Sequence, residues 1–329
     1  MKKIINITVL FVILLANTVK AQQLPLFSQY LFNGFIINPA YAGIDGLSTV
    51  NVVSREQWLG LPNAPTTQMV SYQTRLLPQS FVGQNAAVRQ RLMTKFSNGR
   101  VGLGVTIYND ETGLIMRNGA NFTYAYHLPL DDGQLLSMAL TGSFSQFSID
   151  KSRIDLPVNG SNDNLINNSL NMFMPDMGAG IVYSNNSFYA GLSVDQLFQA
   201  FLKFGSVKND QYQLYRQFNL TAAYRLPMDD QGTVFEPNIL IKTSENAFWD
   251  AQMDITGKVH FPNDFWLGLS FRTGSALVFL TGVVLDQFTI GYSFDYNLNS
   301  LGGTTYGTHE IMLAYKFGNN PGRLRWLNR

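Results

Sequence analysis

The sequence predicts an all-β protein, an outer-membrane antiparallel β-barrel of about 14 strands with an amino-terminal segment packed in or under its lumen. Three observations indicate this class. The chain starts with a secretory signal peptide, and most of the rest alternates apolar and polar side chains in segments of about ten residues, the length of a tilted membrane strand. After the signal peptide, no apolar run is long enough to span a bilayer as a helix. Because backbone polar groups must be satisfied inside lipid, strands can then cross only as a closed barrel.

Residues 1–21 have the features of a signal peptide. Met1 to Lys3 supplies a positive start, residues 4–16 are almost continuously apolar, and residues 19–21 form a small-residue cleavage site. The apolar stretch is shorter than the ~20 residues of a transmembrane helix, so we expect a mature chain that begins at Gln22. The chain contains no cysteine, which excludes a lipoprotein anchor, disulfides and thiolate chemistry.

The composition separates the chain from ordinary soluble domains and from nucleic-acid-binding proteins. Charged residues make up 14% of the chain and aromatic residues 13%, whereas soluble domains have about 25% charged residues. The formal net charge is +1 and no Lys/Arg block is present, so we expect no nucleic-acid partner. The expected surroundings are outer-membrane lipid.

The segment from Trp249 to His260 alternates most clearly. Successive side chains of a strand point to opposite faces. One face carries Trp249, Ala251, Met253, Ile255, Gly257 and Val259, and the other carries Asp250, Gln252, Asp254, Thr256, Lys258 and His260. The first face suits lipid and the second suits water. A soluble β-sandwich would also alternate, but the signal peptide and the alternating last strand, which resembles an outer-membrane assembly signal, favour the membrane.

Counting such segments gives about 14 strands. They cover residues 47–57, 65–76, 99–109, 115–127, 134–147, 175–184, 187–195, 213–226, 233–243, 248–259, 264–272, 276–285, 287–296 and 306–317. An even count is typical of bacterial single-chain barrels and places both termini in the periplasm. We therefore expect a barrel over residues 47–317 and a periplasmic tail over residues 318–329, which is either a frayed end or a contact for a periplasmic partner.

The connections fit the same topology. Short segments rich in Pro, Asn, Asp and Gly are expected as periplasmic turns, at residues 128–133, 185–186, 226–232, 262–263 and 286. The longer segments 149–174 and 196–212 are expected outside, as surface loops. The connection 77–98 is long for a periplasmic turn, and its three basic residues suit either a docking role or a mobile loop.

The sequence contains no constellation that indicates catalysis or metal binding. The three histidines, His127, His260 and His309, have no zinc-site spacing, and no G-x-S-x-G elbow surrounds a candidate serine. The pairs Gly102/Gly104 and Gly178/Gly180 lack the features of phosphate loops and suit the interior of a barrel. We expect no enzyme activity, no cofactor and no metal site.

The amino-terminal segment, residues 22–46, is rich in aromatic and amide side chains and almost uncharged. Such a segment suits packing in or beneath a lumen that a barrel of ~14 strands leaves wide enough to fill or to conduct, and turns are expected at Pro39 and Gly43. We expect Tyr30, Phe32, Phe35 and Tyr41 to fill the lumen, and Gln29, Asn33 and Asn38 to hydrogen-bond to its wall.

Four short motifs resemble the start of the PorP/SprF family. They are Phe27-Ser-Gln-Tyr-Leu-Phe-Asn33, Asn38-Pro-Ala-Tyr-Ala-Gly43, Arg55-Glu-Gln-Trp58 and Ala64-Pro-Thr-Thr-Gln68. The motif residues singled out by the resemblance and by the lumen hypothesis are Gln29, Tyr30, Phe32, Asn33, Asn38, Pro39, Tyr41, Gly43, Gln57, Trp58, Pro65 and Gln68.

The resemblance implies an outer-membrane protein of the type IX secretion system and of the gliding machinery. Such a protein exports cargo or anchors a secreted adhesin through the adhesin's C-terminal sorting domain, together with periplasmic and trans-envelope components of the system. Two other classes stay open. One is a porin or transporter for small or hydrophobic solutes, which a barrel of this size also suits, and the other is an outer-membrane hydrolase, for which no nucleophile and base can be named.

Overall fold

The computed structural model describes residues 27–76, 100–130, 133–149, 172–198, 201–204, 207–299 and 302–318. The signal peptide, the connection 77–98 and the tail from residue 319 lie outside these residues, so what the sequence predicts for them stays a prediction. Within residues 201–213, the structure describes the backbone strands but not the side chains.

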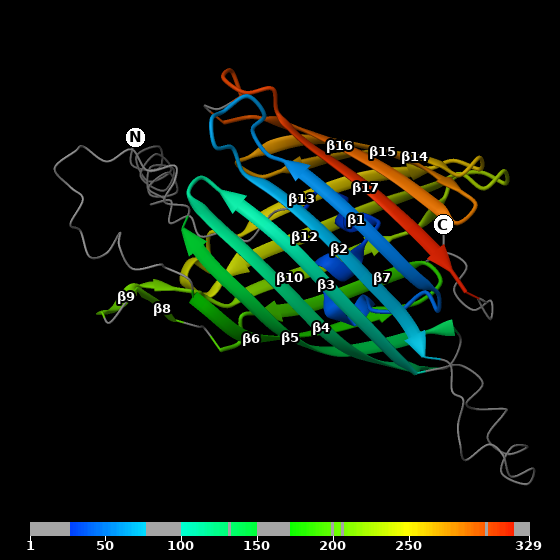
Figure 1. Ribbon diagram of the computed structural model, residues 1–329. Coiled ribbons are helices and arrows are strands. Elements are labelled where there is room, and N and C mark those ends of the chain that lie inside the picture. Colours follow the sequence, from blue (N-terminus) through cyan, green and yellow to red (C-terminus); the bar gives the residue numbers. More distant parts are fainter. Residues whose placement is uncertain are drawn as a thin grey trace, which may run out of the picture.

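Fourteen antiparallel strands form a closed barrel (Figure 1). The strands are β1 (Ser48–Glu56), β2 (Thr66–Leu76), β3 (Val101–Thr112), β4 (Ile115–Pro129), β5 (Leu135–Ile149), β6 (Met172–Ser184), β7 (Phe188–Asp195), β10 (Gln217–Tyr224), β12 (Val234–Ser244), β13 (Gln252–His260), β14 (Phe265–Arg272), β15 (Ala276–Leu285), β16 (Phe288–Asn297) and β17 (Thr308–Phe317). Strands next to each other in this order pair, β17 pairs with β1, and the pairing of β10 with β12 completes the ring. Each strand matches one expected from the sequence, with ends that agree within a few residues.

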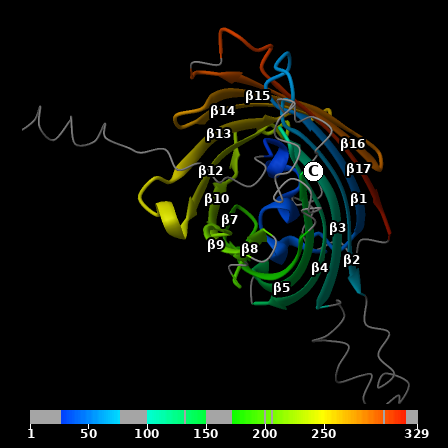
Figure 2. The ribbon, with the colours of Figure 1, turned by 60° about the vertical axis from the view of Figure 1, so that its left-hand side comes forward.

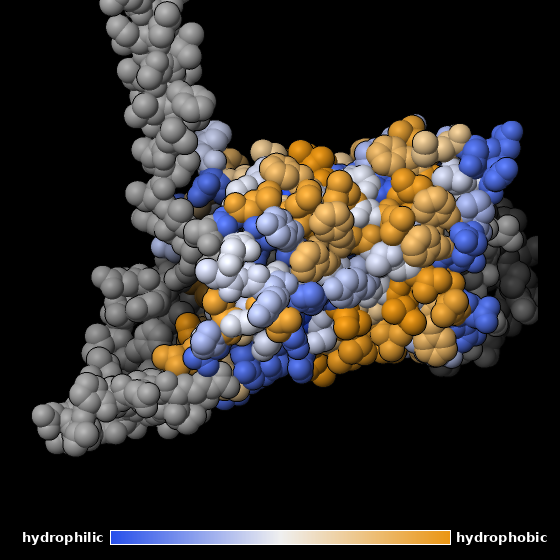
Figure 3. Space-filling model, turned by 90° about the horizontal axis from the view of Figure 1, so that it is seen from above, coloured by the Kyte–Doolittle hydropathy of each residue, from blue (hydrophilic) through white to orange (hydrophobic). Residues whose placement is uncertain are grey.

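Side chains alternate between the lumen and the outer surface. In β13, Asp254, Thr256 and Lys258 are buried in the lumen, whereas Met253 and Ile255 are exposed on the outer surface. Hydrophobic side chains cover much of the middle of the outer surface seen in Figure 3. This arrangement is the one expected of a barrel whose outer surface contacts lipid.

Two short hairpin elements lie where the sequence predicts only connections. β8 (Phe201–Phe204) and β9 (Val207–Gln213) form a separate two-stranded sheet within the expected loop 196–212. β11 (Leu226–Pro227) pairs with β12 inside the expected turn 226–232. Neither element is part of the closed ring.

Trp249 differs from its expected place on the lipid face of a strand. β13 begins only at Gln252, after the 3-10 helix η7 (Glu245–Ala247), and Trp249 lies in the turn between them with 95% of its surface exposed. The backbone N–H of Asp250 donates to the carbonyl oxygen of Ala247 at 3.0 Å. This local turn replaces the strand pairing that the alternation predicts.

The barrel has a turn end and a loop end. Short connections, residues 130–134, 185–187, 261–264 and 286–287, lie at the turn end, where the sequence predicts tight turns. At the loop end the connections include residues 196–216, 245–251 and 298–307, and two tight turns at residues 113–114 and 273–275. The hairpin β8–β9 belongs to the loop end (Figure 1). Among the described residues, no helix is both long and apolar enough to cross a membrane.

Asp229 shows how a short turn is closed by its own side chain. Its Oδ1 accepts the backbone N–H groups of Gln231 at 3.1 Å and Thr233 at 2.8 Å. A hydrogen bond from the Thr233 side chain, followed by these backbone hydrogen bonds, lowers the pKa of Asp229 below its usual value. The aspartate is thus accounted for as a turn residue.

Residues 27–46, the lumen segment, lie inside the ring of strands (Figure 2). The segment contains three short 3-10 helices, η1 (Gln29–Leu31), η2 (Gly34–Ile36) and η3 (Pro39–Tyr41). Its apolar side chains make four small clusters with the wall, which together are the core of the molecule. The fold therefore places the sequence motifs of this segment inside the barrel.

Candidate functional site

The lumen segment runs through the barrel from the loop end to the turn end. Ser28 contacts residues near the loop ends of their strands, such as Arg55 of β1 and Arg272 of β14. Gly43 lies at the other end, against the backbone of Thr74 in β2. The 3-10 turns satisfy much of the segment's own backbone, as expected for buried peptide groups outside a sheet. Residues 22–26 lie outside the described residues, so the expected periplasmic amino terminus stays a prediction.

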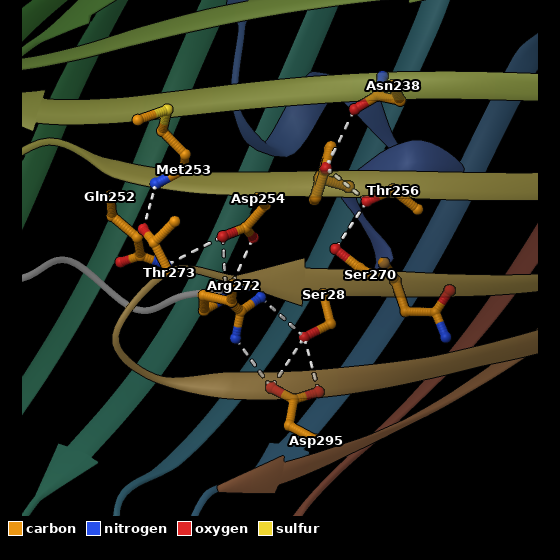
Figure 4. Close-up of polar contacts among 12 residues, drawn as sticks. Ser28, Asn238, Gln252, Met253, Asp254, Thr256, Ser270, Arg272, Thr273 and Asp295 are labelled. Carbon is orange, nitrogen blue, oxygen red and sulfur yellow. Dashed lines mark hydrogen bonds and ion pairs between the residues drawn. The ribbon is translucent and has the colours of Figure 1, made fainter. Parts of the chain in front are cut away.

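Two buried arginines hold the start of the segment, and Figure 4 shows one of them, Arg272, with its contacts to Ser28, Asp254 and Asp295. Arg55 Nη1 and Arg272 Nη2 each donate to Ser28 Oγ at 3.2 Å. Ser28 Oγ in turn donates to the Asp295 carboxylate, 2.9 Å from Oδ1. Glu310 accepts the backbone N–H groups of Ser28 at 2.9 Å and of the next residue at 2.8 Å. The first turn of the segment is therefore fixed through both its side chain and its backbone.

The same arginines form ion pairs with three carboxylates of the wall. Arg55 lies 2.9 Å from both Asp295 Oδ2 and Glu310 Oε2. Arg272 lies 3.1 Å from Asp254 Oδ2 and 2.9 Å from Asp295 Oδ2. All five charged residues are at most 3% exposed. We call these residues with Ser28 the Ser28 cluster, and removing one charge from it would leave another buried without its partner.

The alternation of residues along the chain does not by itself predict the Ser28 cluster. Its members come from five strands and the lumen segment, and the two ends of the Ser28–Glu310 hydrogen bond are 282 residues apart. The alternation does indicate that the five charged residues face the lumen. They lie near the loop ends of β1, β13, β14, β16 and β17. Only the pairing of strands shows that these positions meet.

The polar side chains of the first two short helices make fewer contacts with the wall than the sequence predicts. The Tyr30 hydroxyl donates to Asn238 Oδ1 at 3.1 Å, and Asn33 Nδ2 donates to Ser71 Oγ at 3.4 Å. The Gln29 side-chain amide is buried but has no hydrogen-bond partner in the described part of the chain. For Gln29, the backbone N–H and not the side chain forms a hydrogen bond to the wall.

Asn38 connects the lumen segment to two neighbouring strands. Its Nδ2 donates to the carbonyl oxygens of Ile181 in β6 and Leu192 in β7, both at 3.1 Å. Its Oδ1 accepts the backbone N–H of Ala40 at 2.9 Å and so caps η3, in which Pro39 occupies the first turn. The Asn-Pro pair thus starts a helix and binds the wall at the same place.

His127 of β4 contacts the end of the segment. Its Nε2 is 2.9 Å from the carbonyl oxygen of Ala42, and its Nδ1 is 2.8 Å from Ser137 Oγ. Because a carbonyl oxygen only accepts, Nε2 carries a proton and donates it to Ala42. Gly43 follows with φ +68°, and a Cβ there would lie 2.6 Å from the Thr74 carbonyl oxygen, so only glycine fits this turn.

Aromatic side chains of the segment pack against the wall. Phe32 stacks on Trp266 with ring centroids 3.6 Å apart, and the Lys258 ammonium lies 4.5 Å from the Phe32 ring centroid. Tyr41 packs edge-on against Tyr189 at 6.3 Å. These contacts place Phe32 and Tyr41 inside the lumen, as expected, and the hydrogen bond to Asn238 places Tyr30 there too.

Wall glycines make room for the segment. A Cβ at Gly102 would overlap the carbonyl oxygen of Ala42, and one at Gly104 would overlap the Phe35 ring. Both glycines occupy lumen-facing positions of β3. Gly102 and Gly104, two of the small residues that the sequence places in the barrel interior, are therefore positions where the lumen segment closely approaches the wall.

Four of the motif residues do not belong to the lumen. Gln57 and Pro65 join the two sides of the β1–β2 connection, since the Gln57 N–H donates to the Pro65 carbonyl at 2.8 Å. The Trp58 backbone N–H donates to Thr308 Oγ1 at 3.2 Å, and Gln68 is exposed on the outer surface of β2. The motifs thus divide into a lumen group and a group at the rim of the loop end.

Two cavities in the described part of the lumen lie beside the segment. The loop-end cavity has a volume of about 230 Å³ and is lined by Phe35, Asp176 and Lys242, among others. The turn-end cavity has a volume of about 110 Å³, and its lining includes Tyr41 and Glu236. The segment contributes side chains to both.

The described residues contain no group of three or more His, Cys, Asp or Glu side chains placed to hold a metal ion. The histidines have separate neighbours. His260 Nε2 lies 3.6 Å from Glu236 Oε2, and His309 Nδ1 lies 2.7 Å from the Tyr292 hydroxyl. With His127 committed to the lumen segment, each histidine has a structural contact.

A family model for the type IX secretion system membrane protein PorP/SprF matches residues 19–315 of the chain. No curated protein matches the sequence. Similar solved structures include the outer membrane protein Omp33 of Acinetobacter baumannii, 10% identical over 84% of this chain and 100% of that chain, with a TM-score of 0.42. The CymD monoaromatic hydrocarbon channel is 10% identical over 90% of this chain and 94% of that chain, with a TM-score of 0.49.

Proposed function

The chain belongs to the PorP/SprF family of type IX secretion system membrane proteins, and from this premise we propose that it exports or anchors a large surface adhesin through the adhesin's C-terminal sorting domain. In this role the barrel binds and holds its cargo and carries out no reaction of its own. It is an outer-membrane protein, and lipid covers its apolar outer surface.

The filled lumen is the observation that carries this proposal. Buried ion pairs and hydrogen bonds fix the lumen segment from Ser28 to Gly43. A pore for freely diffusing solutes requires an open lumen, whereas a scaffold that binds a large protein at its mouth does not. The fixed segment therefore favours a binding role over the porin alternative.

The two ends of the barrel have different expected partners. Short turns are typical of the periplasmic side of such barrels, so we place the turn end in the periplasm and the loop end outside. The loop between β7 and β10, with its hairpin β8–β9, is then available to the cargo. β17 ends at the turn end, so the tail after Gly318 would meet periplasmic or trans-envelope components of the secretion system.

Co-purification and conductance together test the proposal. We expect the purified barrel to carry a large surface protein in stoichiometric amount and to conduct poorly in planar bilayers. Ohmic conductance without a bound protein would instead support the porin or transporter alternative.

Deleting residues 24–42 tests the part played by the lumen segment. We expect higher conductance and altered adhesin retention, because the deletion removes all three short helices. Asp230→Ala is the control. Asp230 is exposed in the connection between β10 and β12, and its replacement should change neither conductance nor retention. If the deletion left both conductance and retention unchanged, a plugging role would be wrong.

A further inference from the structure

The loop-end cavity contains a buried carboxylate with an unused acceptor. Asp176 of β6 lines this cavity and is only 8% exposed. Its Oδ1 accepts the backbone N–H groups of Met177 at 2.7 Å and Phe198 at 3.0 Å. Its Oδ2 is buried and has no hydrogen-bond partner among the described residues. Because a buried charged oxygen without a donor is costly, a donor from outside the described chain is expected there.

Asp176 differs in this respect from the other buried carboxylates of the barrel. Each of those has a cation nearby, in the pairs Glu236–Lys258 at 3.0 Å, Asp254–Arg272 at 3.1 Å, Asp295–Arg55 at 2.9 Å and Glu310–Arg55 at 2.9 Å. Lys242 and Arg117 line the same cavity as Asp176. Within the described residues, neither lies close enough to Asp176 to form an ion pair.

A second carboxylate lies beside the first. Asp195 of β7 also lines the cavity and follows Val194, which pairs with Ala179 of β6, three residues along from Asp176. A Cβ at Gly178 would be 2.9 Å from Asp195 Oδ1, so the glycine allows this close approach. The hydrogen bond given to Asp195 from Asn219 Nδ2 is long, at 3.4 Å. Two neighbouring carboxylates thus face the cavity from adjacent strands.

The rest of the lining limits what the cavity can hold. Phe35, Ile36 and Ile37 of the lumen segment, with Met69 and Met174 of the wall, provide apolar surface. The volume of about 230 Å³ is below the ~300–1,000 Å³ of typical small-molecule sites. The space suits one or two side chains and not a folded domain.

We propose that the loop-end cavity binds a basic side chain, lysine or arginine, flanked by apolar residues of the exported polypeptide. The ammonium or guanidinium group donates to Asp176 Oδ2, and the apolar neighbours pack on Phe35 and Ile36. Asp176 also holds the Phe198 N–H, so the site adjoins the start of the loop between β7 and β10. The inference rests on the proposed function and adds the chemistry of the cargo segment.

The test uses the mature full-length protein in lipid nanodiscs and a fluorescent probe peptide, acetyl-Leu-Arg-Leu-amide, with its Gln analogue for comparison. We expect the Arg peptide to bind and the Gln peptide to bind much more weakly. Asp176→Asn preserves the shape and the Oδ1 acceptor, and we expect it to weaken Arg-peptide binding by about tenfold or more, as for a buried charged hydrogen bond. Asp229→Asn, in a turn at the other end of the barrel, should have no effect.

Lys242→Met is expected to change the affinity for the Arg peptide in the opposite direction. It removes a cation that lines the same cavity, so we expect tighter binding of the Arg peptide, by about threefold or more. A general loss of folding could weaken binding in both variants but would not strengthen it in one. Heat-modifiable migration in gels checks that each barrel is folded.

The outcomes separate this inference from the proposed function. Equal binding of the Arg and Gln peptides, or unchanged binding by Asp176→Asn, would overturn the cation site. If neither peptide binds while an adhesin still co-purifies with the parent protein, the cation site is wrong and the proposed function stands. If the Arg peptide binds through Asp176 and no adhesin co-purifies, the site stands as a cation site and the assignment of its occupant to an exported adhesin is overturned.

Discussion

Replacing Arg55 by leucine is expected to release the start of the lumen segment while the barrel stays closed. Arg55 is 3% exposed and contacts Ser28, Asp295 and Glu310. Leucine would leave the fully buried Glu310 carboxylate with backbone donors alone. Removing one partner of a buried ion pair costs about 3 to 5 kcal/mol. The strand pairs of β1 depend on its backbone and are retained.

The chain has no cysteine, so a single introduced thiol reports release without interference. Leu31→Cys places the thiol in η1, where the parent side chain packs beside Trp266. If a maleimide reacts only with the released segment, its rate follows the population of that state. At about 1.4 kcal/mol per factor of ten, Arg55→Leu should raise the labelling rate by about two to three and a half powers of ten.

Two further variants make the result specific. Arg216→Leu removes an exposed ion pair with Glu245, in which the two side chains are 39% and 44% exposed, and such pairs contribute less than about 1 kcal/mol. It should not change labelling. Adding Glu310→Gln to Arg55→Leu removes the uncompensated charge and should slow labelling again. Labelling of Arg55→Leu at the parent rate would refute the assigned role of the Ser28 cluster.

Two other substitutions test the packing of the lumen segment, with thermal unfolding in detergent as the measurement. Gly102→Ala places a methyl group on the Ala42 carbonyl and should destabilise the protein by about 1 to 3 kcal/mol, whereas Gly142→Ala, which has open space around the new Cβ, should not; equal melting temperatures for the two would contradict the close approach. Trp266→Ala removes the ring that stacks on Phe32 and should destabilise by about 3 to 5 kcal/mol; a change below about 1 kcal/mol would mean that this ring does not support the segment.

The strands were predictable because each face of a membrane strand has its own solvent. Lipid on one side and a polar lumen on the other require alternation, and Asp254, Thr256 and Lys258 follow it in β13. The alternation failed at Trp249, where a turn after η7 replaces the strand, and the hairpin β8–β9 lies outside the ring that imposes it. Elements that do not face both lipid and lumen carry no such pattern.

The residues of the lumen segment were predictable only in part. Aromatic and amide composition indicates that the segment is buried, but not which atoms it meets. The Gln29 amide, which is buried and has no hydrogen-bond partner among the described residues, could not be foreseen from composition, and the Ser28 cluster depends on the pairing of strands distant in sequence. The cluster also gives Ser28 and Arg55 a structural role, since both form hydrogen bonds with the Glu310 carboxylate.

The Ser28 cluster has a consequence for the order of assembly. Arg55 belongs to the first strand of the ring and Glu310 to the last, and these two strands meet at the seam where β1 pairs with β17. The lumen segment precedes β1 in the chain, yet it is held by a carboxylate of the last strand. Its attachment to Glu310 requires the last strand to have been synthesised and brought to the first. A seated segment is therefore a mark of a completed barrel, and a chain cut short before residue 308 would have neither the seam nor the carboxylate that holds its own beginning.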